Sequence, residues 1–100
     1  MIVRIVRMEF RPDSIAQFET LFTRIRHHIR QQPGCELLEL HGDPGNPLVR
    51  YTLSHWQQES DLEQYRHSAL FAQVWPETKA LFGARPQAYS LSLIDRVEIT

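Results

Sequence analysis

Five histidines in a chain of 100 residues are the first candidates for chemistry, either as metal ligands or as proton carriers. They are His27, His28, His41, His55 and His67. Their spacing gives neither an HExxH pattern nor a pair of histidines four residues apart on a helix. The adjacent His27 and His28 would point about 100° apart on a helix and could not share one ion. We therefore expect no metal site.

Two of these histidines have candidate partners. If a hairpin turns near residues 44–45, residues whose numbers sum to about 90 face each other, which sets Cys35 near His55. The imidazole could then lower the thiol pKa, whereas a buried structural cysteine is the commoner state of a free Cys35. Glu63 precedes His67 by four residues, the spacing of a helical ion pair. The sharper hypothesis makes His67 a general acid or base at the mouth of a pocket.

A set of aromatic residues is spread over elements that would face one another. Its members are Phe18, Phe22, Tyr51, Tyr65, Phe71, Trp75 and Tyr89. They could form a solid core, or they could line a cavity for a planar apolar ligand, since the polar tips of Tyr and Trp need partners when buried. A kink or break at Pro76, beside Trp75, would help to hold such a cavity open. The pattern leaves both interpretations open.

Apolar periodicity predicts the elements that must position these residues. Strands are expected at 1–10, 35–41, 48–56 and 86–95. Helices are expected at about 13–31 and from Ser60 to Gly83, the second divided at Ser68. Capping boxes are predicted at Ser14 with Gln17 and at Ser60 with Glu63.

The order βαββαβ and right-handed crossovers favour one α+β domain over 1–100, with a ferredoxin-like antiparallel sheet of four strands and both helices on one face. The strands do not alternate cleanly between apolar and polar residues. Val3 and Ile5 point one way, and Ile2 and Val6 the other. Helices can cover only one face, so we expect a second copy against the other face, which makes a homodimer and a dimeric α/β barrel.

Composition excludes several partners. The formal net charge is −1, so no basic surplus is present to bind nucleic acid. No apolar run approaches the roughly 20 residues needed to span a membrane, and the N-terminal residues lack the features of a signal peptide. The single cysteine fits a reducing cytoplasm.

Three segments resemble the antibiotic biosynthesis monooxygenase family of the dimeric α/β-barrel superfamily. They are the opening MIVRIVRMEF with Pro12, the Pro33-Gly34-Cys35 entry to a strand, and the run from Ser54-His55-Trp56 through Leu62 to Phe71. The resemblance implies a ferredoxin-like homodimer with a pocket between sheet and helices. It also implies quinone-forming oxygenase chemistry that needs no metal or flavin.

At several positions the chain differs from the family pattern, and these differences limit which of the family's activities we expect. Members often carry His where this chain has Tyr65. Haem-degrading relatives use Asn, Trp and His at the positions held here by Val6, Tyr65 and Trp75, so haem degradation is disfavoured.

The leading hypothesis is a cofactor-independent, monooxygenase-like enzyme that acts on a small aromatic or quinol-type compound. His67 or His55 would handle the proton. The expected pocket residues are Val6, Phe22, Tyr51, Tyr65, Phe71 and Trp75. The alternatives are a non-catalytic binder or sensor on the same fold, and an isomerase or lyase of the same superfamily.

Overall fold

The computed structural model describes residues 1–99 and confirms the predicted element order. The strands are β1 (Ile2–Glu9), β2 (Cys35–Asp43), β3 (Asn46–Trp56) and β4 (Gln87–Ser92). The helices are α1 (Ile15–Arg30), α2 (Glu59–Arg66) and α3 (Ala69–Lys79). Strand β4 is shorter than the predicted 86–95. No helix within residues 1–99 has the length and apolarity to cross a membrane.

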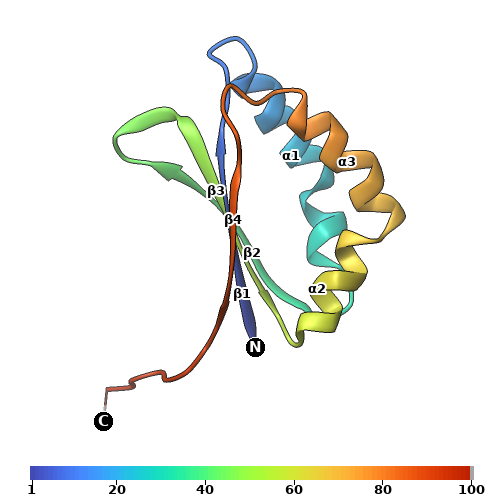
Figure 1. The fold of residues 1–100 in the computed structure, drawn as a ribbon, viewed down its shortest axis with the longest axis vertical. Coiled ribbons are helices and arrows are strands. Elements are labelled where there is room, and N and C mark those ends of the chain that lie inside the picture. Colours follow the sequence, from blue (N-terminus) through green and yellow to red (C-terminus); the bar gives the residue numbers. More distant parts are fainter. Residues whose placement is uncertain (100) are drawn as a thin grey trace.

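The strands form one antiparallel sheet in the order β2-β3-β1-β4. All three helices lie on the same side of this sheet (Figure 1). This is the ferredoxin-like α+β fold that the sequence predicts. We call the side under the helices the covered face and the other side the open face.

Helix α1 forms because its apolar residues recur every three or four positions, which gives it one stripe toward the sheet. The buried residues of this stripe are Phe18, Leu21, Ile25 and Ile29. The predicted Ser14–Gln17 capping box is wrong, because the Ser14 side chain makes no cap hydrogen bond. The Ser14 hydroxyl instead donates to the Leu81 carbonyl at 2.6 Å. It therefore fastens the start of α1 to the segment after α3.

Helix α2 begins two residues earlier than the predicted Ser60–Glu63 box requires, so that prediction is also wrong. The Asp61 carboxylate accepts a hydrogen bond from the Gln58 backbone N–H at 3.2 Å. Asp61 also lies directly against Gly34, whose φ of +82° favours glycine. A Cβ at position 34 would collide with the Asp61 side chain.

Helix α3 begins where the sequence indicates, since the Ser68 hydroxyl accepts a hydrogen bond from the Phe71 N–H at 3.1 Å. The helix runs through Pro76 rather than breaking there. Proline cannot donate a backbone hydrogen bond, but its carbonyl still accepts one. The Ala80 N–H donates to the Pro76 carbonyl at 3.1 Å, which continues the helical pattern.

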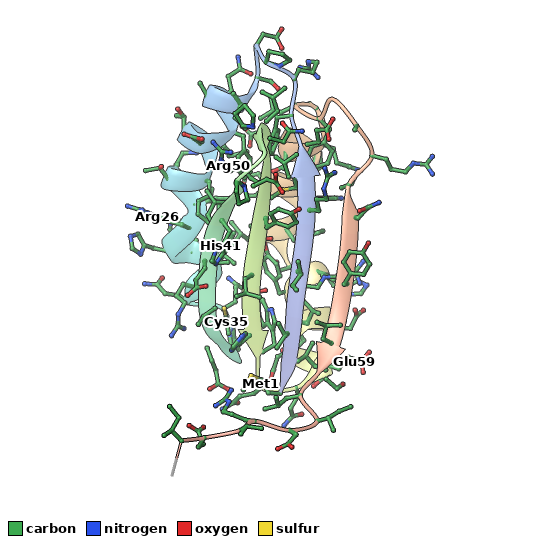
Figure 2. All side chains as sticks on the ribbon, turned by 90° about the vertical axis from the view of Figure 1, so that its left-hand side faces the viewer. Met1, Arg26, Cys35, His41, Arg50 and Glu59 are labelled. Atoms are coloured by element: carbon green, nitrogen blue, oxygen red, sulfur yellow. The ribbon has the colours of Figure 1, made fainter. Side chains whose placement is uncertain are left out.

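The core fills the space between the sheet and the helix layer as three buried clusters. One joins Met8, Phe10 and Phe18; another joins Leu21, Ile25, Ile29 and Val74; the third joins Cys35, Trp56 and Leu62. Strand alternation sends the odd-numbered residues of β1 and β4 to the open face. That face looks toward the viewer in Figure 2, with no helix in front of it.

Candidate functional site

A cavity of about 260 Å³ lies between the covered face of the sheet and the helices. Its walls come from all three helices, from all four strands and from the loop before β4. The lining is predominantly aliphatic and aromatic, as in sites for small organic ligands. The volume is slightly below the usual range for drug-sized molecules, which suits a compact mono- or bicyclic ligand.

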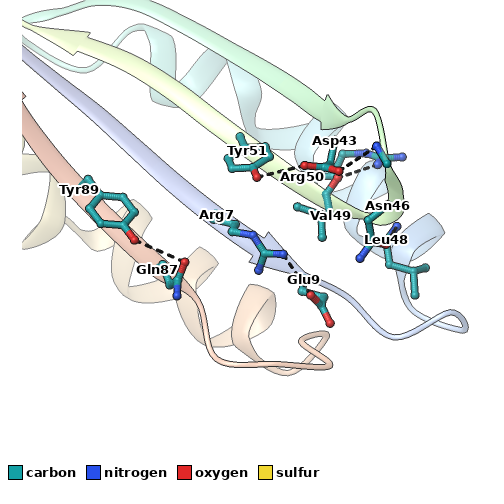
Figure 3. A network of polar contacts seen from close by, with 11 residues as sticks. Arg7, Glu9, Asp43, Asn46, Leu48, Val49, Arg50, Tyr51, Gln87 and Tyr89 are labelled. Atoms are coloured by element: carbon teal, nitrogen blue, oxygen red, sulfur yellow. Dashed lines mark hydrogen bonds and ion pairs between the residues drawn. The ribbon is translucent and has the colours of Figure 1, made fainter.

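Five of the six predicted pocket residues meet around this cavity. They are Val6, Phe22, Tyr65, Phe71 and Trp75. The sixth, Tyr51, does not line it. On β3, Thr52 and Ser54 face the cavity, so alternation turns Tyr51 to the open face. There its hydroxyl donates to the Asp43 carboxylate at 3.2 Å (Figure 3).

Four aromatic rings form a continuous series along one side of the cavity. Trp56 stacks on Tyr65, with 5.3 Å between ring centroids and 19° between ring planes. Tyr65 meets Phe71 edge to face at 5.2 Å, and Phe71 stacks on Trp75 at 5.7 Å. Such pairs hold one another's orientation, so the wall facing a ligand is well defined. Trp56 was missed as a pocket residue, although its strand parity places it opposite Ile2 on the covered face.

Tyr65 is the one lining residue whose side chain is a weak acid. Burial, followed by the nearby Cys35, raises the pKa of its phenol to about 12. Within residues 1–99 its hydroxyl has no hydrogen-bond partner and is not sealed from the surroundings, so a ligand in the cavity could reach it. At neutral pH this group is a hydrogen-bond donor and not a base.

The predicted pairing of Cys35 with His55 is wrong. A register shift in β2 sets Cys35 opposite Trp56 and Leu37 opposite His55. The extra residue turns Cys35 into the core and leaves His55 on the open face. Burial raises the pKa of the Cys35 thiol, which disfavours the reactive thiolate. Cys35 is therefore a buried structural cysteine.

His67 lies at the exposed C-terminal end of α2 and does not line the cavity either. Its Nδ1 lies 2.8 Å from the backbone carbonyl oxygen of Glu63. The Glu63 carboxylate instead forms an ion pair with Arg66 at 3.1 Å. The lining thus contains no histidine, and the positions of His55 and His67 give no support to their assignment as catalytic groups. Across the described part of the chain, no cluster of three or more His, Cys, Asp or Glu residues is placed to hold a metal ion.

Two arginines that sequence reasoning missed also line the cavity. Arg4 extends from β1 and Arg66 from the last turn of α2. The Arg4 guanidinium donates to the Ser90 hydroxyl at 2.9 Å. A usable signal was present in the sequence, because Arg4 has the same strand parity as Val6 and must share its face.

Comparison with known proteins identifies the fold and the family. A protein from Deinococcus radiodurans that is named for the antibiotic biosynthesis monooxygenases superimposes with a TM-score of 0.89 at 17% identity, covering 100% of this chain and 99% of that one. Rv0793 from Mycobacterium tuberculosis gives a TM-score of 0.88 at 16% identity, covering 97% and 98%. A conserved protein from Methanosarcina mazei Go1 gives 0.85 at 18%, covering 91% of each chain. At these identities the likeness concerns the fold alone.

No curated protein matches the sequence significantly. The family comparison is more informative, because the model for antibiotic biosynthesis monooxygenases matches residues 1–75, three quarters of the chain. That match covers β1 through α3 up to Trp75, and so it includes most of the cavity lining. The chain belongs to the antibiotic biosynthesis monooxygenase family.

Proposed function

We propose that this protein is a cofactor-independent, monooxygenase-like enzyme for a small aromatic or quinol-type compound. The observation that carries the proposal is the cavity of about 260 Å³, walled by stacked aromatic rings, in a chain of this family. The rings offer flat apolar surface to a planar substrate. The aromatic walls shield a reactive intermediate from water on the sides that they cover.

In this chemistry the substrate supplies the electrons. Loss of a phenolic proton makes the ring electron-rich enough to reduce O₂. One atom of O₂ forms a bond to a ring carbon and the other is released as water. The product is a quinone. All four electrons come from the substrate, so the reaction needs no external reductant. The protein binds the ring, keeps water away and places hydrogen-bond donors at the oxygen that becomes charged.

The side chains of the cavity divide this work. Trp56, Phe71 and Trp75 hold the ring of the substrate. Tyr65 donates a hydrogen bond to a substrate oxygen, because its pKa of about 12 keeps it protonated. Neither proposed histidine is needed for this arrangement, and neither lines the cavity.

Oxygen consumption tests the proposal. A panel of hydroquinones and anthrones is incubated with the protein in an oxygen-electrode cell. We expect uptake above buffer for at least one compound, and a reduced rate for Trp75→Ala and Tyr65→Phe. The exposed substitution Gln17→Ala is the matched control, and it should leave the rate unchanged. Uptake that equals buffer across the panel would contradict the enzymatic proposal.

A non-catalytic binder is the second candidate, and one observation favours it. The ionisable side chains of the lining are Arg4, Tyr65 and Arg66, which provide no conventional general base at neutral pH. A binder would retain ligand affinity and show no turnover in any variant. Turnover without oxygen would instead identify an isomerase or lyase.

The open face supports the proposed homodimer. Tyr89 and Leu91 of β4 are 52% and 50% exposed, and Leu93 just beyond the strand is 46% exposed. Leu91 and Tyr89 lie opposite Val3 and Ile5 in the β1–β4 pairing, so the four side chains form one apolar surface. A second copy packed on this face would remove that surface from water. Light scattering at micromolar concentration should give twice the mass of the chain, and a monomeric mass would refute the dimer.

A further inference from the structure

One end of the cavity carries positive charge. Arg4 and Arg66 are the charged members of the lining, and every other lining residue is uncharged. Arg4 interrupts a row of apolar residues on the covered face of β1, where its neighbours on the same side are Ile2 and Val6. A cation in such a row is more informative than the hydrophobic residues around it, because even the partial burial of a charge has a cost.

This charge is not fully compensated. Arg66 is paired with the Glu63 carboxylate at 3.1 Å. Arg4 has the Ser90 hydroxyl as its hydrogen-bond partner and forms no ion pair within residues 1–99. Glu63 also attracts Arg4, but its single negative charge offsets only one of the two guanidinium groups. The end of the cavity therefore keeps a net positive charge.

The environment of Arg4 disfavours its charged form. Burial lowers the pKa of the Arg4 guanidinium from its ordinary value, and the like charge of Arg66 lowers it further. Both effects would be relieved by an anion between the two groups. Access is available, since Ala88 lines the cavity and is exposed, as is Ser90 on the same face of the edge strand β4.

We infer that the cavity binds an aromatic anion, with its ring among Trp56, Tyr65 and Phe71 and its negatively charged oxygen held by the guanidinium groups of Arg4 and Arg66. The planar guanidinium fork suits a carboxylate or a phenolate, and hydrogen bonds between ionised partners are about twice as strong as neutral ones. The inference rests on the proposed function only in placing the ligand in this cavity.

The same arrangement explains how a quinol could be activated without a base in the lining. Stabilisation of the phenolate by two cations lowers the pKa of the bound phenol. The O–H bond breaks, the proton passes to bulk water through the open mouth, and the electron pair stays on the oxygen. The arginines thereby do the work that the sequence assigned to a histidine.

Calorimetric titration with two probes of matched shape tests the inference without oxygen. 2-Naphthoate carries the negative charge and 2-naphthamide does not. We expect the wild-type protein to bind 2-naphthoate roughly tenfold tighter or more, since the added bonds are charge-assisted. Arg4→Gln and Arg66→Gln should each reduce that preference. Arg24→Gln removes the same charge from α1, outside the cavity, and should leave the preference intact.

Three outcomes would overturn the inference: equal affinity for the two probes, no binding of either, or an anion preference that survives in both cavity variants. If Arg4→Gln failed to fold, the ratio of the two affinities in the wild-type protein and in Arg66→Gln would still test the inference. Because these titrations need no turnover, a failed oxygen assay with an intact anion preference would remove the monooxygenase proposal and leave this one standing.

A third probe, 2-naphthol, distinguishes the two kinds of anion. Its absorbance reports ionisation, so the pKa of the bound phenol can be read directly. A fall of roughly 1 or more relative to free 2-naphthol, lost in Arg4→Gln, identifies a phenolate ligand. An unchanged pKa together with preferred binding of 2-naphthoate identifies a carboxylate.

Discussion

The two faces of the sheet differ in how much of their apolar surface a single chain buries. On the covered face Trp56 is 1% exposed and Met8 3%, while on the open face Leu91 is 50% exposed. The open face also carries hydrogen bonds between polar side chains, among them those from Tyr51 to Asp43 and from Arg7 to Glu9 (Figure 3). The difference teaches that the fold of a single chain depends on the covered face, which also holds the proposed ligand site, whereas the open face is left for the proposed dimer.

The largest expected effect comes from deleting a covered-face ring. Trp56→Ala removes a fully buried side chain and should lower the free energy of unfolding by about 3–5 kcal/mol. Leu91→Ala on the open face should cost less than about 1 kcal/mol in the monomeric chain, because half of that side chain is already in water. Urea unfolding at low protein concentration measures both. Similar losses at the two positions would erase the distinction between the faces.

The next effect concerns association. Leu91→Lys would place a charge in the proposed interface of each copy, and should raise the dissociation constant of the dimer roughly 100-fold. Folding should survive, since the side chain reaches water in a single chain. Sedimentation equilibrium measures the constant. Gln17→Lys adds the same charge on exposed α1 and should leave the dimer intact, and an unaffected dimer in Leu91→Lys would move the interface elsewhere.

A smaller effect is expected on the free energy of unfolding at alkaline pH, where substitutions of Tyr65 and Tyr51 should differ. The folded-state pKa of Tyr65 is raised to about 12, so its stabilising effect is complete below the unfolded pKa near 10 and is lost as pH rises toward 12. The loss should reach about 1.4 kcal/mol by pH 11. Tyr65→Phe should abolish this part of the pH dependence, whereas Tyr51→Phe on the open face should not. Thermal unfolding between pH 8 and 11 distinguishes them, and parallel curves for Tyr65→Phe and the wild type would contradict the expectation.

The smallest effect is expected outside both faces. Arg24 of α1 and Glu77 of α3 form an ion pair at 3.2 Å with both side chains more than half exposed. Arg24→Gln should change the free energy of unfolding by less than about 1 kcal/mol, because water and salt screen such pairs. A larger loss in urea unfolding would show that the helix layer depends on surface charge.

The sequence predicted the fold because hydrophobic periodicity repeats over whole elements. The α1 stripe and the double-sided strands each involve many residues, so a single misjudged position does little harm. The capping predictions failed because caps depend on one side chain. Ser14 found the Leu81 carbonyl, a partner 67 residues away, and no local pattern reveals such a contact.

The site was predictable where parity on a strand or helix decides the direction of a side chain. Val6 and the helical aromatic residues line the cavity for this reason. The positions of Cys35 and His55 were not predictable, because a single extra residue in β2 shifts the register and changes the face. Arg4 was overlooked although its parity was known.

Gly34 links two distant parts of the chain. Its positive φ lets the loop before β2 turn, and the missing Cβ leaves room for the Asp61 side chain that starts α2. α2 in turn carries Tyr65 and Arg66 to the cavity. Any larger residue at 34 would push the carboxylate of Asp61 away from that helix. Homologues that lose this glycine should therefore also have changed residue 61, so that the two positions vary together through evolution.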